Sequence, residues 1–350
     1  MGKRIAMVGS GAVRGYDGSY LAHHGADVTF IDTWPEHVET MNRDGLKLRG
    51  VSDAENIDVK VRAVHVTQVQ DLQKEGPFDI AFVSVKSYET QFAAALIKGY
   101  LAEHGFIVSL QNAINEERIA EVVGWHRTTG CIASTISCAL EGPGLVRRHV
   151  PLRGDSYTVF RAGEPHGRVT GRIQEVADML SVIDSAKVTK NLWGERWSKL
   201  VINSSGNGIS AATGLGGNGM AKNDQTRSVS IRMAAETTQV ALALGFTIEK
   251  RMGFTGEEWV AAANGDKKLF QDIEAKALEA TKNRKDGAVP STGQDMVKGR
   301  KTEIDAINGF VVEKGREMGI ATPLNEKIVD MVHKCERGEV KTDPSNVAGW

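Results

Sequence analysis

The sequence has few cysteines, no excess of charge of either sign and no long hydrophobic run. The three cysteines, Cys131, Cys138 and Cys335, are odd in number and widely spaced, which indicates reduced thiols and not a disulfide framework. The net charge of -1 argues against a nucleic-acid partner, because binding to a phosphate backbone needs a concentrated excess of Lys and Arg. No stretch reaches the roughly 18 apolar residues that a membrane-spanning helix requires.

Signals for metal binding and for export are also lacking. The nine histidines are scattered and no Cys or His pair has the spacing of a zinc site, so we expect no metal. The hydrophobic run after Arg4 is too short for a signal peptide, and we expect a soluble, cytoplasmic protein. With 41% hydrophobic and 25% charged residues, the 350-residue chain is an ordinary globular sequence long enough for two domains.

The N-terminal residues carry the pattern of a dinucleotide-binding fold. A short apolar run over 3–8 breaks at Gly9-Ser10-Gly11, a helix is expected over 12–24, and a second strand over 27–32. In such a βαβ unit Gly9 permits the tight turn and Gly11 lets the backbone approach a pyrophosphate. The N–H groups that open the helix, at Ala12 and Val13, then receive its negative charge.

The glycine pattern departs from the usual one at its third position, which is Arg14. The third glycine serves close packing of the helix on the strand, so Gly15 or Gly18 could take over that role. Alternatively, Arg14 reaches the phosphates as a cation.

Asp32 ends the second predicted strand, 21 positions after Gly11. A carboxylate at this place accepts hydrogen bonds from the adenosine ribose and repels a 2′-phosphate. The following Thr33-Trp34-Pro35 supplies no cation to neutralise such a phosphate, so we expect NAD in preference to NADP. The alternative is that Asp32 only caps a helix that starts near Pro35.

Two further predicted strands, over 78–85 and 105–110, are followed by Lys86 and by Gln111-Asn112. Ligands bind at the carboxyl ends of strands in open α/β sheets, so Lys86 and Asn112 are placed to contact cofactor or substrate. The alternative for each is a solvated loop residue. Strand-like runs over 131–140, 145–150 and 157–161 are expected to complete the sheet with antiparallel pairing, and 187–191 to form its last strand.

From Leu192 onward the pattern is helical. Lys199, Asn203 and Asn207 have i, i+4, i+8 spacing, which places an ammonium and two amides on one face of an otherwise apolar helix. Buried polar groups cost free energy without partners, so this stripe is expected to face a ligand or an interface. A long amphipathic helix is expected from residue 298 to near Gly319.

Taken together, these motifs resemble the ketopantoate reductase (2-dehydropantoate 2-reductase) family, from Lys3 to about Arg337. The motifs that carry the resemblance are the Gly9/Gly11 turn, Val85-Lys86-Ser87-Tyr88-Glu89-Thr90, Gln111-Asn112, Lys199-x-x-x-Asn203, and Ser291 upstream of Thr302-Glu303-Ile304-Asp305. The resemblance implies an α/β chain with a Rossmann NAD(P)-binding domain over 1–190 and an all-helical substrate and dimerisation domain over 191–335. A tail over 336–350 follows.

The resemblance also implies roles for individual residues. Lys199 falls on the general acid, and Glu303 on the glutamate that organises substrate and lysine. Lys86 falls near the nicotinamide and substrate. The positions that resemble substrate contacts are Asn112, Asn203, Asn207 and Ser291.

Elementary chemistry agrees with these roles. Hydride addition to a ketone builds negative charge on the carbonyl oxygen, and a lysine ammonium can stabilise that charge and donate the proton. The expected reaction is hydride transfer between NAD(P)H and the carbonyl of a 2-oxo acid such as 2-dehydropantoate, catalysed by a homodimer. The alternatives are an NAD-dependent dehydrogenase for a different 2-hydroxy acid or secondary alcohol, and a non-catalytic nucleotide sensor.

Two features are unusual for this family. Ala113 follows Gln111-Asn112, where a more glycine-rich turn is expected. Residues 249–289 are longer and more charged than expected between two helices of the C-terminal domain, and could reshape a lid over the substrate pocket.

Overall fold

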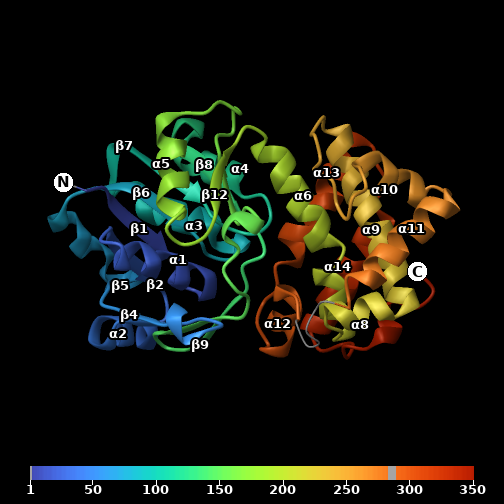
Figure 1. Ribbon diagram of the computed structural model, residues 1–350, viewed down its shortest axis with the longest axis horizontal. Helices are drawn as coiled ribbons and strands as arrows, with labels where there is room; N and C mark the ends of the chain where they lie inside the picture. The colour runs from blue at the N-terminus through green and yellow to red at the C-terminus, as the bar shows by residue number, and fades with distance from the viewer. Residues whose placement is uncertain (1, 283–288) are drawn as a thin grey trace. The chain divides into compact units, whose positions relative to one another are not determined.

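The computed structural model describes residues 2–282 and 289–350, and the chain divides into two compact units, Met1–Leu192 and Trp193–Trp350. The first unit is an α/β fold and the second is helical (Figure 1). This confirms the predicted fold class.

The first unit is built on an eight-stranded sheet of order β12-β11-β8-β7-β6-β1-β2-β5. Neighbouring strands are parallel except β8 and β11, which pair antiparallel. The strands are β1 (Arg4–Val8), β2 (Asp27–Asp32), β5 (Arg62–His65), β6 (Phe78–Val83), β7 (Leu101–Ser109), β8 (Thr128–Ala133), β11 (Phe160–Gly163) and β12 (Ala186–Thr189).

Helices cover both faces of this sheet because its central strands are apolar on both sides. In β1, Ile5 and Met7 belong to the core under α1 and α5, whereas Ala6 and Val8 belong to the core under α3 and α4. The helices of this unit are α1 (Ala12–His23), α2 (Pro35–Asp44), α3 (Thr90–Lys98), α4 (Glu116–Val123) and α5 (Gly171–Leu180). Short 3-10 helices are η1 (Asp53–Glu55), η2 (Val66–Glu75), η3 (Ser87–Glu89), η4 (Trp125–Arg127) and η5 (Gly154–Ser156).

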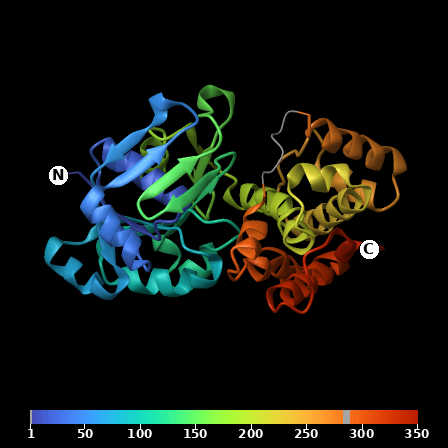
Figure 2. The same cartoon turned by 90° about the horizontal axis from the view of Figure 1, so that it is seen from below.

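A second, four-stranded sheet of order β4-β3-β10-β9 brings together segments far apart in the sequence (Figure 2). Its strands are β3 (Leu46–Arg49), β4 (Ile57–Val59), β9 (Cys138–Gly142) and β10 (Leu145–Arg148). The prediction that the runs after Cys131 complete the main sheet is therefore wrong for β9 and β10. Their hairpin turns at Gly144 (φ +67°) and buries Val146 in the core that contains Tyr16 of α1.

The second unit is organised around the 20-residue helix α9, which packs against α8, α10, α11, α13 and α14. The helices of this unit are α6 (Leu192–Ser204), α7 (Asn207–Thr213), α8 (Gly217–Lys222), α9 (Asp224–Ala243), α10 (Gly256–Ala263), α11 (Lys267–Glu279), α12 (Ser291–Val297), the π-helix η6 (Asp305–Gly309), α13 (Phe310–Met318), α14 (Pro323–Glu336) and the 3-10 helix η7 (Pro344–Val347).

The long helix predicted from residue 298 ends at Gly319 as expected but begins later. Residues 298–303 are not helical, and the first turns form the π-helix η6. At this start the Thr302 hydroxyl accepts a hydrogen bond from the backbone N–H of Ile304 (3.3 Å), one of the first N–H groups that have no acceptor within the helix. Gly319 ends α13 in the left-handed conformation (φ +68°).

The C-terminal residues lie against the helical unit. Val347 is fully buried in the core that contains Ile209. The Asn346 side chain and the Asp343 backbone N–H both donate to the carbonyl of Ala212, at 2.8 and 3.1 Å. The tail is therefore part of this unit's packing.

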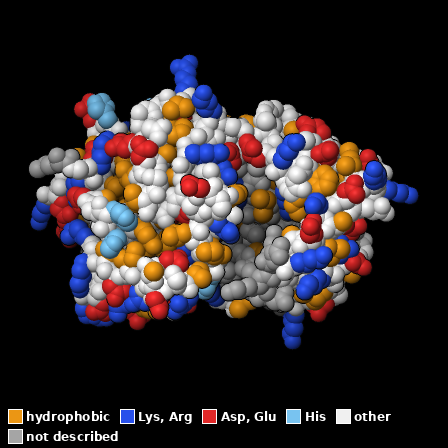
Figure 3. All heavy atoms as spheres, viewed as in Figure 1, with side chains coloured by type: hydrophobic (Ala, Val, Ile, Leu, Met, Phe, Trp, Pro, Cys, Tyr) orange, Lys and Arg blue, Asp and Glu red, His pale blue; other side chains and the backbone are white. Residues whose placement is uncertain are grey.

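The face of the molecule in Figure 3 carries acidic and basic side chains interspersed, in keeping with the net charge of -1. Over residues 2–282 and 289–350, no helix has the length and hydrophobicity to cross a membrane.

Gly18 allows α1 to lie close to the sheet. A Cβ at this position would lie 2.7 Å from the ring of Phe30, which is fully buried and cannot withdraw. We expect Gly18→Ala to lower the free energy of unfolding by about 1–3 kcal/mol, measured by urea denaturation. Gly99→Ala is the control, since a Cβ there would meet no atom within 4 Å. This substitution should change the free energy of unfolding by less than about 0.5 kcal/mol. Equal stability of the two variants would contradict this packing.

Candidate functional site

The turn after β1 lies where the strand order reverses. β2 and β6 flank β1, and chain connections leave in opposite directions on its two sides. Gly9 has φ +89°, and a Cβ there would lie 3.0 Å from Val85 Cγ1 and 3.2 Å from the backbone of Ser84. Both the left-handed backbone and the close approach require glycine. Because the turn lies where the strand order reverses, it lies in the crevice where open α/β sheets bind ligands.

The start of α1 suits an anionic group. Gly11 is the N-cap residue, no side chain caps the helix, and its first turn contains no acidic residue. The first N–H groups of a helix, here those of Ala12 and Val13, have no acceptor within the helix. A Cβ on Gly11 would meet no atom within 4 Å, so a ligand can approach the backbone here. These residues fit the pyrophosphate of a dinucleotide.

Arg14, at the third position of the glycine pattern, is paired with an acidic residue of its own helix. Its guanidinium forms an ion pair with the buried carboxylate of Asp17 (2.7 Å), one turn along α1. Burial raises the pKa of Asp17 to about 6, and Arg14 partly opposes this rise. Gly18 provides the close contact between helix and strand, which is the packing role expected of Gly15 or Gly18.

Asp32 faces the glycine turn. Its Oδ2 accepts hydrogen bonds from the Ser10 backbone N–H (2.7 Å) and hydroxyl (2.6 Å), and its Oδ1 accepts one from Trp34 N–H (2.9 Å). The N-cap residue of α2 is Trp34, which makes no side-chain capping bond. Asp32 therefore orients the turn and is more than a helix cap. Since each carboxylate oxygen can accept two hydrogen bonds, Oδ1 can also accept one from a ribose hydroxyl.

The loops that carry Lys86 and Asn112 are joined by buried polar side chains. The Gln111 amide donates to the carbonyl of Val85 and to the hydroxyl of Thr90, both at 2.8 Å. The Asn115 amide donates to the Ser87 hydroxyl (3.2 Å) and to the carbonyl of Asn112 (2.8 Å). Lys86 and Asn112 are half-buried on a cross-braced edge at the carboxyl ends of β6 and β7.

Sequence reasoning missed this bracing by Thr90, Gln111 and Asn115. The available signal was their position directly after buried strands, where polar side chains must find partners inside the fold. Ala113, in the same turn, adopts φ +61° and is buried. The left-handed conformation costs a residue with a Cβ about 1–2 kcal/mol, which explains why glycine is expected here.

The predicted polar stripe of the helical unit crosses a break between two helices. α6 ends at Ser204 and α7 begins at Asn207, with Gly206 as N-cap residue at φ −130°, ψ −42°. The prediction of one continuous helical face over 199–207 is therefore wrong. Asn203 and Asn207 are nonetheless both buried, at 7% and 8% exposure, and Lys199 is half-buried on α6.

Two predicted substrate contacts lie together. Asn207 Nδ2 lies 3.4 Å from Ser291 Oγ, although 84 positions separate them in the sequence. Close packing of α12 on α7 makes this possible, because a Cβ on Gly293 would lie 2.5 Å from the Ser210 hydroxyl. Asn203 Nδ2 has no hydrogen-bond partner within the described part of the chain, which costs about 1–3 kcal/mol unless a ligand accepts a hydrogen bond from it.

Glu303 is buried (5% exposed) and directly precedes Ile304 and the π-helix. This segment is tied to α6: the Asn308 amide donates to the carbonyl of Ser204 (2.9 Å), and the rings of Phe310 and Trp197 lie 5.8 Å apart. Lys199 and Glu303 therefore belong to elements that pack together. Single π-helical turns are frequent at functional sites.

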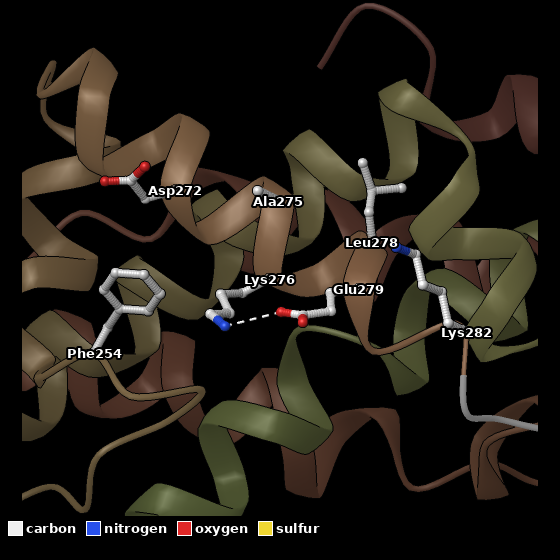
Figure 4. Close-up of a pocket in the computed structure, with 7 residues that line it drawn as sticks. All are labelled: Phe254, Asp272, Ala275, Lys276, Leu278, Glu279 and Lys282. Carbon is white, nitrogen blue, oxygen red and sulfur yellow. Dashed lines mark hydrogen bonds and ion pairs between the residues drawn. The ribbon is translucent and has the colours of Figure 1, made fainter.

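A surface hollow lies elsewhere, along α11 (Figure 4). It has a volume of about 640 Å³ and is lined by Phe254, Asp272, Ala275, Lys276, Leu278, Glu279 and Lys282. Lys276 and Glu279 pair with each other (2.8 Å) on an exposed surface, and none of the predicted site residues lines the hollow. Across the described ranges, no group of three His, Cys, Asp or Glu side chains could hold a metal ion.

Comparison with known proteins agrees with this geometry. The family model described as Ketopantoate reductase PanE/ApbA matches residues 5–160, and that of its C-terminal part matches residues 191–336. The chain belongs to the ketopantoate reductase family. It is 28% identical over 338 residues to a protein of Archaeoglobus fulgidus named 2-dehydropantoate 2-reductase, covering 96% of this chain and 99% of that protein.

Solved structures of the family have the same fold. The crystal structure of 2-dehydropantoate 2-reductase from Geobacter metallireducens matches with a TM-score of 0.75 and 26% identity, over 95% of this chain and 99% of that one. A D-mandelate dehydrogenase in complex with NADH and anilino(oxo)acetate matches with a TM-score of 0.77 over 96% and 99% of the two chains. At 22% identity the latter shows the fold alone. The predicted family is confirmed, and the chain is an oxidoreductase of the ketopantoate reductase type.

Gly11 offers a test of the dinucleotide site that leaves the fold intact. If the pyrophosphate binds at this turn, Gly11→Ala should weaken NADH binding about tenfold or more, because the new methyl group would occupy space that the pyrophosphate needs. The melting temperature should be nearly unchanged, since the Cβ meets no protein atom. Fluorescence titration with NADH measures the affinity.

Gly171→Ala is the matched control, because Gly171 also opens a helix and a Cβ there meets nothing within 4 Å. The site is wrongly placed if Gly11→Ala binds NADH as tightly as this control does.

Proposed function

We propose that this family member transfers hydride from NADH to the carbonyl carbon of a 2-oxo acid such as 2-dehydropantoate. The observation that carries the substrate site is the grouping of buried polar side chains near Lys199, with the Asn203 amide lacking a protein acceptor and Asn207 beside Ser291. A 2-oxo acid offers a carbonyl and a carboxylate as acceptors for these donors. Relatives such as that of Archaeoglobus fulgidus are named for this activity.

We assign the cofactor to the first unit. Gly9, Ser10, Gly11, Ala12 and Val13 would hold the pyrophosphate. Asp32 would hold the adenosine ribose, and Lys86 and Asn112 would lie near the nicotinamide. The carboxylate of Asp32, followed by Thr33 and Trp34, favours NAD over NADP because it repels a 2′-phosphate. A protein of the same fold, D-mandelate dehydrogenase, has been solved with NADH.

Lys199 acts as the general acid in this proposal. A bound reduced nicotinamide supplies the hydride, and negative charge then develops on the carbonyl oxygen of the substrate. The Lys199 ammonium stabilises that charge and donates the proton. Glu303 orients the ammonium and the substrate, from the start of a helix that is packed against α6.

The remaining predicted contacts fix the substrate. Asn203, Asn207 and Ser291 carry donors for the carboxylate and hydroxyl oxygens of the acid. Asn112 is assigned as a further contact, and the Asn115 amide braces the backbone of its loop by donating to the Asn112 carbonyl (2.8 Å).

A second candidate is an NAD-dependent dehydrogenase of a different 2-hydroxy acid or secondary alcohol. Two observations favour it: the acidic residue at the ribose position, and the long segment before Ser291. That segment forms α10 and α11, whereas residues 283–288 of the predicted 249–289 insertion lie outside the described residues. The resemblance to the family further implies a homodimer, which sedimentation-velocity ultracentrifugation measures directly.

Steady-state kinetics separate these possibilities. With 2-dehydropantoate as substrate, we expect kcat/KM to be at least about tenfold higher for NADH than for NADPH. A preference for NADPH would refute the role of Asp32. Oxidation of other 2-hydroxy acids by NAD, without activity on 2-dehydropantoate, would instead identify the second candidate.

Lys199→Met tests the general acid, because methionine keeps the length and apolar stem of lysine without its ammonium. We expect kcat to fall by about 10²–10⁴-fold, while the dissociation constant for NADH changes less than about twofold. Lys250→Met, which removes an exposed lysine of the same unit, is the control. Turnover of Lys199→Met within a few-fold of this control would remove Lys199 from the mechanism.

A further inference from the structure

His37 is a buried histidine of α2 to which the proposed reaction gives no role. Its side chain is only 1% exposed. It lies between the glycine turn after β1 and the hairpin turn between β9 and β10, which belong to two different sheets. A buried imidazole needs partners for both ring nitrogens, and these two turns supply them.

The hydrogen bonds define the protonation state of the ring. Gly144 N–H lies 2.9 Å from His37 Nδ1 and can only donate, so Nδ1 accepts and carries no proton. Nε2 lies 3.2 Å from the carbonyl of Ser10, which can only accept, so Nε2 donates. His37 is therefore the neutral Nε2–H tautomer. Burial lowers the pKa of His37 and keeps the ring neutral, against the opposing charge of Asp32.

The partner on the hairpin side is rigid. Gly144 has φ +67°, its carbonyl accepts a hydrogen bond from Lys47 N–H (2.8 Å), and a Cβ there would lie 2.8 Å from Thr40 Cγ2. The ring of His37 is also stacked on that of Trp34, with centroids 5.5 Å apart and planes at 24°. The imidazole is thus held by its edge and by one face.

The partner on the other side is the residue at the centre of the dinucleotide turn. Asp32 accepts from the N–H and hydroxyl of Ser10, and His37 donates to the Ser10 carbonyl. The backbone N–H and the backbone carbonyl of Ser10 are therefore both held by hydrogen bonds. Nε2 of His37 is the hydrogen-bond donor that sets the direction of this carbonyl.

We propose that His37 is a positioning residue for the dinucleotide: its Nε2–H holds the Ser10 carbonyl, and its Nδ1 ties that turn to the rigid β9–β10 hairpin. The inference rests on the proposed function of the Gly9–Gly11 turn. With the Ser10 carbonyl fixed, the N–H groups that follow it at the start of α1 are preorganised toward the pyrophosphate. His37 acts through Ser10 and does not touch the reacting atoms.

Two substitutions separate the two hydrogen bonds. Glutamine places its amide nitrogen near the position of Nε2 and can still donate to Ser10. Asparagine places its side-chain oxygen near Nδ1 and can accept from Gly144, but it is too short to reach Ser10. We expect His37→Asn to raise both the dissociation constant and the KM for NADH about fivefold to tenfold, with kcat and the KM for the 2-oxo acid changed less than about twofold. His37→Gln should restore most of the affinity.

Each result bears on the inference. Thermal melting measures the stability lost through altered packing, and we expect this loss to be similar for His37→Asn and His37→Gln. The control is His104→Asn, which changes an exposed histidine of the same unit. The inference is overturned if His37→Asn binds NADH as tightly as the wild-type protein. It is also overturned if His37→Asn and His37→Gln lose NADH affinity to the same extent, in proportion to their loss of stability. Failure of the wild-type protein to bind NADH or NADPH would instead overturn the proposed function.

Discussion

The geometry of the first unit depends on one tight passage of the backbone, from β1 through Gly9 into α1. At this point the chain lies against Val85 and turns with a positive φ, which only glycine adopts at no cost. The turn cannot move independently, because Gly9 N–H donates to the carbonyl of Ile31 and Ser10 donates twice to Asp32. The next element is a helix whose first N–H groups have no acceptor within the helix, so a strand end, a helix start and a carboxylate come together where we propose that the dinucleotide binds.

The helical unit buries many polar side chains, which need hydrogen-bond partners inside the fold. Asn308 donates to Ser204 O and to Asn325 Oδ1, and Asn325 in turn donates to Glu236 of α9. Glu236 also accepts from two N–H groups at the start of α14, and burial raises its pKa in spite of these bonds. This connected network fixes the helix that follows Glu303, whereas the nearby Asn203 amide is left without a protein acceptor. In the proposed function, the Asn203 amide donates to an oxygen of the substrate.

Local patterns in the sequence predict the strands, the glycine turn and the helix of the N-terminal βαβ unit well. The glycine turn, Asp32 and the strand ends at Lys86 and Asn112 follow from spacing alone, because each depends on residues within one βαβ unit. The pairing of β9 and β10 was not predictable in this way, since alternating apolar residues fit either sheet and the choice is made by burial against α1. The break at Ser205-Gly206 was missed because apolar residues keep a helical period across it. The roles of His37 and Gln111 depend on contacts between segments far apart in the sequence, which no local pattern shows.

The proposed function requires that the turn over Gly9, Ser10 and Gly11, with Asp32 beside it, holds the dinucleotide. A crystal structure of the protein with NADH tests this most directly. We expect the pyrophosphate to contact the backbone N–H groups at the start of α1 and a ribose hydroxyl to lie within hydrogen-bond distance of the Asp32 carboxylate. A nucleotide bound away from this turn, or one whose ribose has no contact with Asp32, would contradict it.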